Sequence, residues 1–418
     1  MQGKKFFIII GGISAALAVT LILGSSAWAA TYKTLHTFTG KDGSEPVVGL
    51  TLDADGNLYG AACSGGTYGA GVIFELAPNP DGTWIESTLY DFTGGADGGC
   101  PNGGLVFDAF GNLYGTSGTI VPYWNLANVF ELSPNPDGTW TETVLHNFLG
   151  GTDGQLPLAP LIFDAQGSLY GTTLWGGSPN WGTVFKLTPN SDGTWTESVI
   201  YAFKGPPDVG HPQGPLVFDA SGNLYGTGYW GGSTKCVVAG CGGVFKLAPK
   251  GGGTWRESVL HRFNIWDGAD PQWGVIFDAS GNLYGNTAWG TNEQTCGNNK
   301  CGTTYQLVPN IDGTWKIHIA HMFTDGKDGG VPGCNVVLDA ADNLYGAAYE
   351  GGRFGYGLVF KLTPKPTGGW KETVLHVFDD HPGAYPSSGL IFDAAGNLYG
   401  ETGGDGSTTF GSVYEITP

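Results

Sequence analysis

The fold is decided by the stretch Leu52-Asp53-Ala54-Asp55-Gly56-Asn57-Leu58-Tyr59-Gly60, whose core, Asn-Leu-Tyr-Gly, returns six more times along the chain, once with serine in place of asparagine. Successive copies are separated by 55, 56, 55, 59, 61 and 54 residues, and each brings similar flanking sequence with it. The later copies begin at Asn112, Ser168, Asn223, Asn282, Asn343 and Asn397. Self-similarity at a regular spacing is the signature of a repeat protein. The chain is therefore predicted to contain seven copies of one structural module.

One module, residues 159–203, shows what the repeat unit is. Four short runs, at residues 160–164, 168–173, 183–188 and 194–203, are separated by turns rich in Gly, Asn, Asp and Pro. Runs of this length between such turns predict β-strands, and the module has no helical periodicity. We expect each module to be a four-stranded antiparallel sheet, and we call its strands A to D in chain order.

The two ends of the chain indicate how the sheets are arranged. Sheets whose faces are apolar stack on one another, and radial stacking gives a β-propeller. Residues Thr31–Phe38 resemble an isolated strand D, and Ser412–Thr417 resemble a strand C with no strand D after it. These complementary ends favour a ring in which the N-terminal strand closes the last blade. We predict an all-β chain, a single seven-bladed β-propeller of four-stranded antiparallel blades over residues 30–418.

The first 29 residues differ from the rest of the chain. Two lysines precede an apolar run of 18 residues from Phe6 to Leu23, and the segment ends in Ala27-Trp28-Ala29. A basic start, an apolar middle and a small-residue end are typical of a secretory signal peptide. We expect residues 1–29 to be removed on export. The alternative is an uncleaved signal that anchors the chain, because the apolar run nearly reaches bilayer-spanning length.

The charge of the chain restricts its partners. The net charge is −19 at pH 7, which argues against nucleic acid or an anionic membrane surface as a partner. It is compatible with a secreted protein that self-repulsion keeps soluble, or with one that binds cations. No later stretch is apolar enough to span a membrane. We expect a monomer that is secreted, periplasmic or held at the cell surface.

Seven cysteines in a chain predicted to be exported suggest disulfide bonds with one cysteine left over. One pairing scheme leaves Cys334 free and forms the pairs Cys63–Cys100, Cys236–Cys241 and Cys296–Cys301. A second scheme pairs Cys334 with Cys296 or Cys301. Spacing does not fix connectivity, so both schemes stay open.

The modules share long phrases, such as Gly182-Thr183-Val184-Phe185-Lys186-Leu187-Thr188-Pro189. In these phrases the chain resembles the GloVer tandem repeat of exported bacterial proteins, and the resemblance covers essentially everything after the first 29 residues. It implies secretion and a propeller-like repeat domain. It carries no catalytic residues over to this chain.

A repeat protein provides an internal control, because features found in every module belong to the scaffold. One aspartate precedes the A–B turn in all seven modules, from Asp53 to Asp393. The stretch 53–57 can suggest a calcium loop. A carboxylate that accepts backbone N–H bonds across a tight turn, with glycine at positive φ, explains the phrase better.

Histidines and tryptophans of strand D also recur. Tyr90 and Tyr201 replace histidine in two modules, which favours a packing or hydrogen-bonding role over a metal site. The histidines at this position are His36, His146, His261, His321 and His376. Strand D begins with a tryptophan assigned to blade packing at Trp84, Trp140, Trp195, Trp255, Trp315 and Trp370.

A second series of aspartates lies in the D–A loops, four residues before a proline. Its members are Asp42, Asp97, Asp153, Asp208, Asp267 and Asp328. A ring of carboxylates could attract Ca²⁺, which prefers several oxygen ligands. One carboxylate per blade places neighbours too far apart to share an ion easily, so turn capping is preferred. We predict no cofactor or metal centre, with Ca²⁺ as the open alternative.

Features found in only some modules are candidates for function. The B–C and D–A loops of an up-and-down sheet emerge at one end, so one face of the propeller is predicted to be variable. Three tryptophans share one B–C loop position in modules 3, 4 and 5, where module 6 has Glu350 after Tyr349. Each indole either fills space under its own loop or contacts a ligand, for which sugar rings suit flat aromatic side chains. The candidate ligand-binding residues are Trp175, Trp230, Trp289, Glu350, Tyr349, His211 and His381.

The sequence contains no established catalytic motif. It has no His-Glu-x-x-His zinc motif, no Gly-x-Ser-x-Gly elbow, and no histidines at zinc spacing beside its cysteine pairs. Candidates for acid–base chemistry, besides the two histidines just named, are Glu350, Asp270, Asp325, Asp379 and Glu401. No reaction class follows from them.

The sequence therefore favours an exported, non-catalytic binding propeller. Its ligand, a glycan or a cell-surface polymer, is expected on the face formed by the B–C and D–A loops. One alternative is an extracellular hydrolase or lyase that acts on polysaccharide at the same face. The other is a scaffold for protein interactions.

Overall fold

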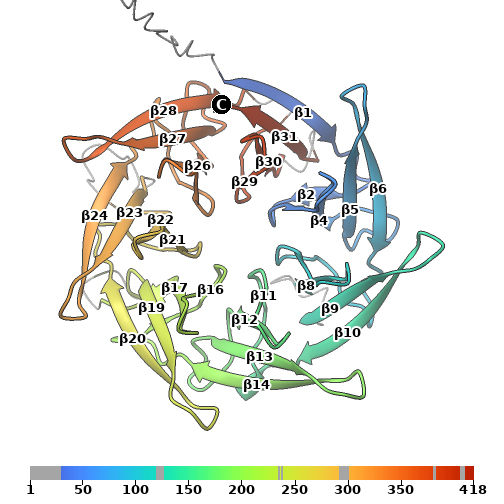
Figure 1. The fold of residues 1–418 in the computed structure, drawn as a ribbon, viewed down its shortest axis with the longest axis horizontal. Coiled ribbons are helices and arrows are strands. Elements are labelled where there is room, and N and C mark those ends of the chain that lie inside the picture. The colour runs from blue at the N-terminus through green and yellow to red at the C-terminus, as the bar shows by residue number, and fades with distance from the viewer. Residues whose placement is uncertain are drawn as a thin grey trace, which may run out of the picture.

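The computed structural model describes residues 30–118, 127–233, 236, 239–290, 301–379, 383–404 and 410–418. Within these residues the chain forms a closed ring of seven antiparallel blades, as predicted (Figure 1). The predicted signal segment, residues 1–29, lies outside the described residues. No helix among the described residues is long and apolar enough to cross a membrane.

The strands are ordered A, B, C, D from the axis of the ring outward (Figure 1). Strand A is β3 (Thr51–Leu52), β7 (Val106–Phe107), β11 (Ile162–Phe163), β16 (Val217–Phe218), β21 (Ile276–Phe277), β25 (Val337–Leu338) and β29 (Ile391–Phe392). Strand B is β4 (Leu58–Ser64), β8 (Leu113–Ser117), β12 (Leu169–Thr173), β17 (Leu224–Gly228), β22 (Leu283–Thr287), β26 (Leu344–Ala348) and β30 (Leu398–Thr402). Strand A is shorter than the apolar run predicted for it.

The two outer strands are longer. Strand C is β5 (Val72–Pro78), β9 (Ala127–Pro134), β13 (Thr183–Pro189), β19 (Gly243–Pro249), β23 (Thr303–Pro309), β27 (Leu358–Pro364) and β31 (Ser412–Thr417). Strand D is β6 (Trp84–Asp91), β10 (Trp140–Phe148), β14 (Trp195–Ala202), β20 (Trp255–Arg262), β24 (Trp315–Met322), β28 (Trp370–Val377) and β1 (Thr31–Thr37). Blade 1 gains a further short strand, β2 (Ser44–Pro46), which pairs with β4. Blades 1 to 7 follow chain order, and blade 7 contains β29, β30, β31 and β1.

The N-terminal strand closes the ring. β1 pairs antiparallel with β31, in a register that runs from Thr31 opposite Thr417 to Thr37 opposite Ser412. Strand D of blade 7 therefore comes from the start of the chain and the other three strands from its end. This confirms the closure predicted from the two incomplete ends.

The glycine of the repeated phrase is explained by packing between strands B and C. A Cβ atom on Gly115 would lie 2.5 Å from Cζ of Phe130, which is fully buried. The aromatic ring on strand C thus lies directly over strand B where it has no side chain. The core of each blade then packs against its neighbour, as where Ile73 and Phe92 of blade 1 meet Leu113 of blade 2.

The repeated aspartate plays the predicted turn role. Oδ1 of Asp53 accepts the backbone N–H groups of Asp55 and Asn57, at 2.9 and 2.8 Å. Oδ2 accepts bonds from the Asn57 amide and from the hydroxyl of Tyr59. Partial burial raises the pKa of Asp53, but these hydrogen bonds outweigh it and the net shift is downward. One carboxylate thus stabilises the A–B turn and bonds the tyrosine of strand B, which explains why these residues recur together.

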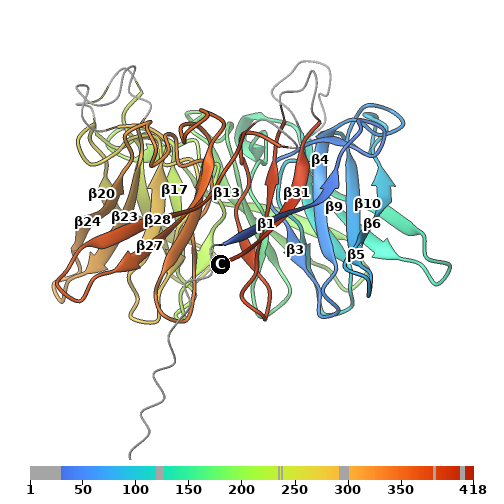
Figure 2. The same cartoon turned by 90° about the horizontal axis from the view of Figure 1, so that it is seen from above.

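The B–C and D–A loops lie on one face of the ring. They are joined by short antiparallel pairs, for example between β15 (Val209–Gly210) and β18 (Trp230–Gly231). Gln155 pairs in the same way with Trp175. Figure 2 shows these loops along one edge of the disc and short hairpin turns along the other. We call the first edge the loop face.

Candidate functional site

The three loop tryptophans occupy equivalent places on the loop face, as the repeat predicted. Trp175, Trp230 and Trp289 each form a bridge or short ladder with the D–A loop that enters their own blade. Their side chains are half-buried. This pairing fixes the backbone of each tryptophan. The surroundings of the three indole rings therefore differ between blades only through the neighbouring side chains.

Each D–A loop has a proline, and the residue before it lies close to the B–C loops. We call it the pre-proline position, and its members are Glu45, Cys100, Leu156, His211, Asp270, Val331 and Tyr385. Six of the seven have a positive φ between 50° and 61°, the exception being Val331. At three of these positions the side chain contacts the B–C loop of the preceding blade: Cys100 is bonded to Cys63, His211 packs on Trp175 and Tyr385 stacks on Tyr349.

At the junction of blades 3 and 4, His211 lies inside a cluster of tryptophans. Its ring centroid is 4.3 Å from that of Trp175 and 4.9 Å from those of Trp181 and Trp230. The two rings of Trp175 and Trp230 are 6.2 Å apart and nearly perpendicular. The structure therefore brings together three residues that the sequence singled out separately, and adds Trp181. We call these four residues the aromatic cluster.

The protonation of His211 is set by burial. Only 3% of the residue is exposed, and burial lowers the pKa of His211 despite the bond to a backbone carbonyl. Nδ1 lies 2.9 Å from the carbonyl oxygen of Leu174, so Nδ1 carries the proton and donates it there. Nε2 is then an acceptor, and no described residue donates a hydrogen bond to it. Nε2 is therefore the remaining acceptor of a neutral imidazole enclosed by tryptophans.

The next junction adds a tyrosine and a carboxyl group. Tyr229 stacks on Trp230 with ring centroids 5.1 Å apart. Burial, and then the charge of Asp270, raise the pKa of Tyr229. Burial alone raises the pKa of Asp270 to about 7. The backbone N–H of Asp270 donates to the Cys241 carbonyl, but no bond to its carboxylate comes from the described residues. An acceptor or acid group thus lies one blade away from the aromatic cluster.

The other predicted ligand-binding residues lie apart from this cluster. Trp289 packs on the core between blades 4 and 5. Tyr349 stacks on Tyr385, with ring centroids 5.0 Å apart, between blades 6 and 7 across the ring (Figure 1). Glu350 follows Tyr349 in that loop, and its carbonyl accepts the N–H of Gly330. His381 lies outside the described residues. The predicted ligand-binding residues therefore lie at several places around the ring and do not form a single cleft.

The axis of the ring opens on the loop face through a small cavity of about 160 Å³. Residues just before strand A of all seven blades line it, and its polar groups are Asn102, Gln213, Gln272, Asn335, Ser387 and Ser388. A second cavity of about 280 Å³ lies among the strand A residues and is lined mostly by Leu, Val and Ile side chains. These polar residues were not among the predicted site residues, and their variation from module to module is the signal in the sequence that marks them.

A third cavity, of about 550 Å³, lies on the outer part of the loop face at blade 4. Its lining includes Trp266, which is 70% exposed, and Arg262, whose Nε donates to the Pro207 carbonyl. Cys236 also lines this cavity.

Disulfide bonds brace the loop face. Cys63–Cys100 joins blades 1 and 2, and Cys236–Cys241 closes the B–C loop of blade 4, both as in the first predicted scheme. Cys301 is also disulfide-bonded, and its predicted partner, Cys296, lies outside the described residues. The alternative pairing of Cys334 is wrong, because Cys334 is a buried free thiol.

Comparisons with known proteins agree with the fold. A family described as the Gloeobacter/Verrucomicrobia repeat matches residues 24–162, 124–297 and 290–418. No curated protein sequence matches the chain.

Several solved structures are similar in shape. One is the extracellular domain of a putative hybrid two-component system from B. thetaiotaomicron, at 10% identity and TM-score 0.55, covering 91% of this chain and 39% of that one. An ancestral GH74 enzyme matches at 12% identity and TM-score 0.53, covering 90% and 48%. A puromycin-hydrolysing peptidase from Mycobacterium tuberculosis matches at 10% identity and TM-score 0.55, covering 91% and 53%. The chain spans about half or less of each, and at these identities the likeness shows the fold alone.

Proposed function

We propose that this chain, which belongs to the Gloeobacter/Verrucomicrobia repeat family, is an exported monomeric propeller that binds a neutral glycan on its loop face. The observation that carries the proposal is the aromatic cluster, in which Trp175 and Trp230 flank a neutral His211. Disulfide bonds, which persist in oxidising compartments, support export.

The chemistry of the cluster suits a sugar better than other ligands. The apolar face of a pyranose ring stacks on an indole, while its hydroxyl groups need acceptors and donors at the edge. His211 offers an acceptor at Nε2, and Asp270 offers a carboxyl group one blade away. The net charge of −19 repels polyanions, so a neutral polymer is favoured over a uronate-rich one.

Binding to a polysaccharide panel tests the proposal. Isothermal titration against neutral glucans, mannans, xylans and galactans is compared with alginate and hyaluronan. The Trp230→Ala variant is expected to lose about tenfold or more in affinity, which is ~1.4 kcal/mol. Trp266→Ala is the matched control, because Trp266 is exposed on the same face outside the cluster. Melting temperatures establish that both variants fold.

Two outcomes would overturn the proposal. One is that the wild-type protein binds no polymer of the panel. The other is that Trp266→Ala abolishes binding while Trp230→Ala leaves it intact, which would move the site to the outer cavity.

One observation favours a second candidate, hydrolysis of the bound glycan. Burial raises the pKa of Asp270 to about 7, the range of a carboxyl that acts as a general acid near neutral pH. Release of reducing ends from the bound polymer, lost in Asp270→Asn, would support it. Binding without turnover supports the binding protein.

A further inference from the structure

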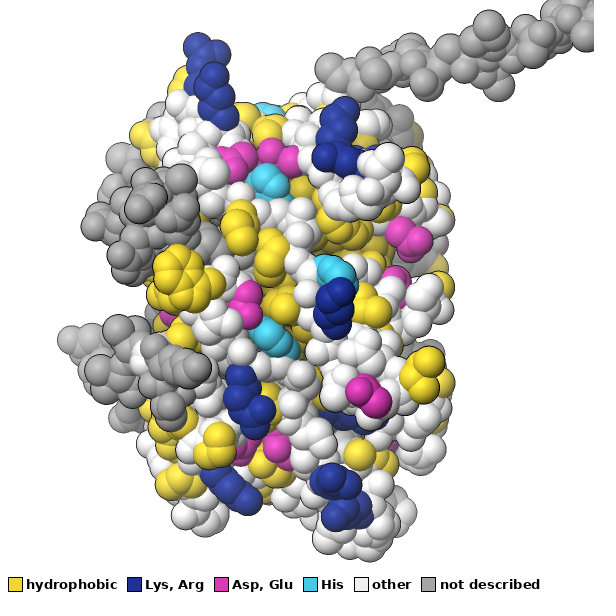
Figure 3. Space-filling model, turned by 90° about the vertical axis from the view of Figure 1, so that its left-hand side faces the viewer, with side chains coloured by type: hydrophobic (Ala, Val, Ile, Leu, Met, Phe, Trp, Pro, Cys, Tyr) yellow, Lys and Arg dark blue, Asp and Glu magenta, His cyan; other side chains and the backbone are white. Residues whose placement is uncertain are grey.

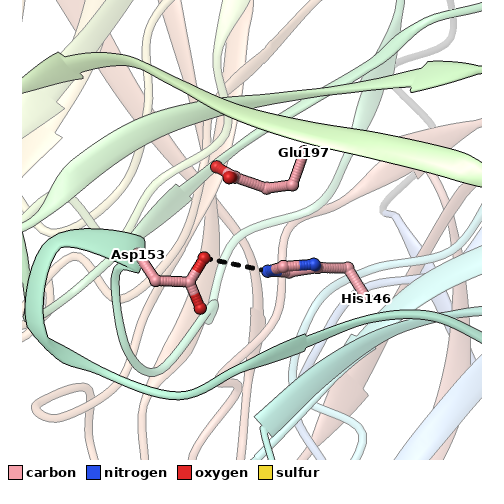
Figure 4. Close-up of side chains that lie close together, drawn as sticks. All are labelled: His146, Asp153 and Glu197. Carbon is pink, nitrogen blue, oxygen red and sulfur yellow. Dashed lines mark hydrogen bonds and ion pairs between the residues drawn. The ribbon is translucent and has the colours of Figure 1, made fainter.

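The outer wall of the propeller carries a cluster of three metal-ligating side chains at the junction of blades 2 and 3. His146 lies on β10, Asp153 at the end of the short 3₁₀ turn η1 (Gly151–Asp153), and Glu197 on β14 of the next blade (Figure 4). Nε2 of His146 lies 3.0 Å from Oδ1 of Asp153. One ligand atom from each residue lies within 4.8 Å of the other two. All three side chains point toward a common point in Figure 4.

The cluster is accessible to an ion from solution. The side chains of His146 and Asp153 are 23% and 24% exposed, and Glu197 is partly buried. Figure 3 shows histidine side chains on another part of the outer wall, some with acidic side chains beside them. The three residues are therefore partly exposed, at the junction of blades 2 and 3.

The repeat shows what the scaffold itself requires at this place. In two other junctions a tyrosine replaces the histidine and donates to the aspartate, as Tyr90 does to Asp97 and Tyr201 to Asp208. His261 still bonds Asp267 although the residue equivalent to Glu197 is Ile317. The bond to the aspartate is therefore the structural element. Neither the imidazole nor the glutamate is needed for it.

The carboxyl group of Glu197 has one oxygen without a partner among the described residues, as do those of Glu142 and Glu257 at the two junctions with tyrosine, so the imidazole is what distinguishes this junction from those. Oε1 of Glu197 is buried, and no described residue forms a hydrogen bond with it. Two carboxyl groups and one imidazole thus offer three ligand atoms of types that divalent cations bind.

The same residue types recur at two further junctions, where the three ligand atoms do not all lie within 4.8 Å of one another. These are His36, Asp42 and Glu86 at one junction, and His321, Asp328 and Glu372 at the other. Among the described residues, only the junction of blades 2 and 3 brings three ligand atoms within 4.8 Å.

We propose that His146, Asp153 and Glu197 bind one divalent transition-metal ion of the Zn²⁺ type. One imidazole nitrogen and two carboxylate oxygens suit Zn²⁺, whereas Ca²⁺ takes six to eight oxygen ligands. Three protein ligands leave a coordination position for water. The ion would join β10 to β14 and so tie two neighbouring blades at the outer wall. This goes beyond the hydrogen-bonding role that the sequence indicated for His146.

The test uses the whole protein freed of metal with a chelator. Zn²⁺ binding is measured by calorimetry, and Co²⁺ binding by its visible absorption, which reports nitrogen and oxygen ligation directly. Ca²⁺ and Mg²⁺ are the comparison ions. We expect one equivalent of Zn²⁺ at this site, release of protons on binding, and a higher melting temperature with Zn²⁺ than without.

The repeat supplies the matched variants. His146→Tyr introduces the residue found at two equivalent positions, so it should fold, and we expect at least a 100-fold loss in affinity. Glu197→Gln preserves the shape and should cost at least tenfold. His261→Tyr is the control and should bind as the wild type does. Absence of Zn²⁺ binding up to 1 mM, binding that survives in His146→Tyr, or equal affinity for Ca²⁺ would each overturn the proposal.

Discussion

The most quantitative prediction concerns Glu401, a fully buried carboxyl group where the ring closes. Its Oε2 accepts the backbone N–H of Gly49 in blade 1 at 2.8 Å, and its own N–H donates to Oγ of Ser388. No described residue bonds its Oε1. In the other blades the equivalent residue is neutral, and in two of them it bonds to the next blade: Thr227 to the carbonyl of Trp273 and Asn286 to that of Cys334. Only blade 7 places an ionisable group at this position.

The magnitude follows from the shift in the pKa of Glu401. Burial raises it to about 7 in the folded protein. In the unfolded chain the pKa of a glutamate is ~4.3. A carboxyl group with a raised pKa in the folded state destabilises that state as the pH rises above the unfolded value. The cost is about 1 kcal/mol at pH 5 and about 3.5 kcal/mol at pH 8, where it is nearly complete.

Glu401→Gln removes this titration while an amide oxygen still accepts the Gly49 N–H. We expect the difference in free energy of unfolding between the variant and the wild type to be about 2.5 kcal/mol larger at pH 8 than at pH 5, in favour of the variant. A chain of this size unfolds with an entropy of roughly 0.8 kcal/mol/K, so this corresponds to about 3 °C in melting temperature. Thermal unfolding of both proteins at the two pH values measures it.

Glu45→Gln is the control, because Glu45 is an exposed carboxyl group near the same junction. It should show no difference between the two pH values. The reasoning would be refuted if Glu401→Gln changed the melting temperature equally at pH 5 and pH 8. It would also be refuted if the variant melted at a lower temperature than the wild type at pH 8.

Three further predictions rest on comparison between blades. Asp342 stands at φ 59° where the other six A–B turns have glycine, so Asp342→Gly should raise the free energy of unfolding by roughly 0.5–1 kcal/mol in denaturant titrations. Tyr305 has a buried hydroxyl without a partner among the described residues, and five other blades have phenylalanine there. Tyr305→Phe should therefore stabilise by roughly 1 kcal/mol, and a loss of stability would show that the hydroxyl is bonded. Replacing Cys63 and Cys100 by serine opens a loop with a sequence separation of 37 and should cost about 4 kcal/mol in the chain-entropy model, whereas unchanged unfolding would contradict it.

The fold was predictable because the sequence features that determine each turn and strand recur in seven modules. Asp53 and its equivalents mark the A–B turn, and the incomplete ends of the chain mark the closing pair of strands. Both features act within one blade or between two adjacent strands. The predicted strand lengths were less accurate, because strand A pairs with strand B over only two residues in each blade.

The candidate site was predictable only in part. The shared position of Trp175 and Trp230 was visible in the sequence, but their contact through His211 was not. His211 is 36 residues from one and 19 from the other, and no local rule relates them. Their contact depends on how the D–A loop of one blade meets the B–C loop of the preceding one, which is a property of the ring. Trp181 was likewise missed as a partner of His211 for this reason.

The pre-proline position argues most directly that the loop face is where the blades differ in function. A left-handed conformation costs a residue with a side chain roughly 1 kcal/mol, and glycine avoids that cost. In the A–B turns the chain uses glycine at positive φ in six blades. At the pre-proline position no blade has glycine, although six of the seven residues have positive φ. The side chains there are retained despite the strain, and all seven are different, so their role is not shared scaffolding. Cys100 uses the position for a disulfide bond, Tyr385 for stacking and His211 for the aromatic cluster. One backbone conformation thus carries six different side chains around a single face, which is the arrangement expected of a binding surface on a rigid scaffold.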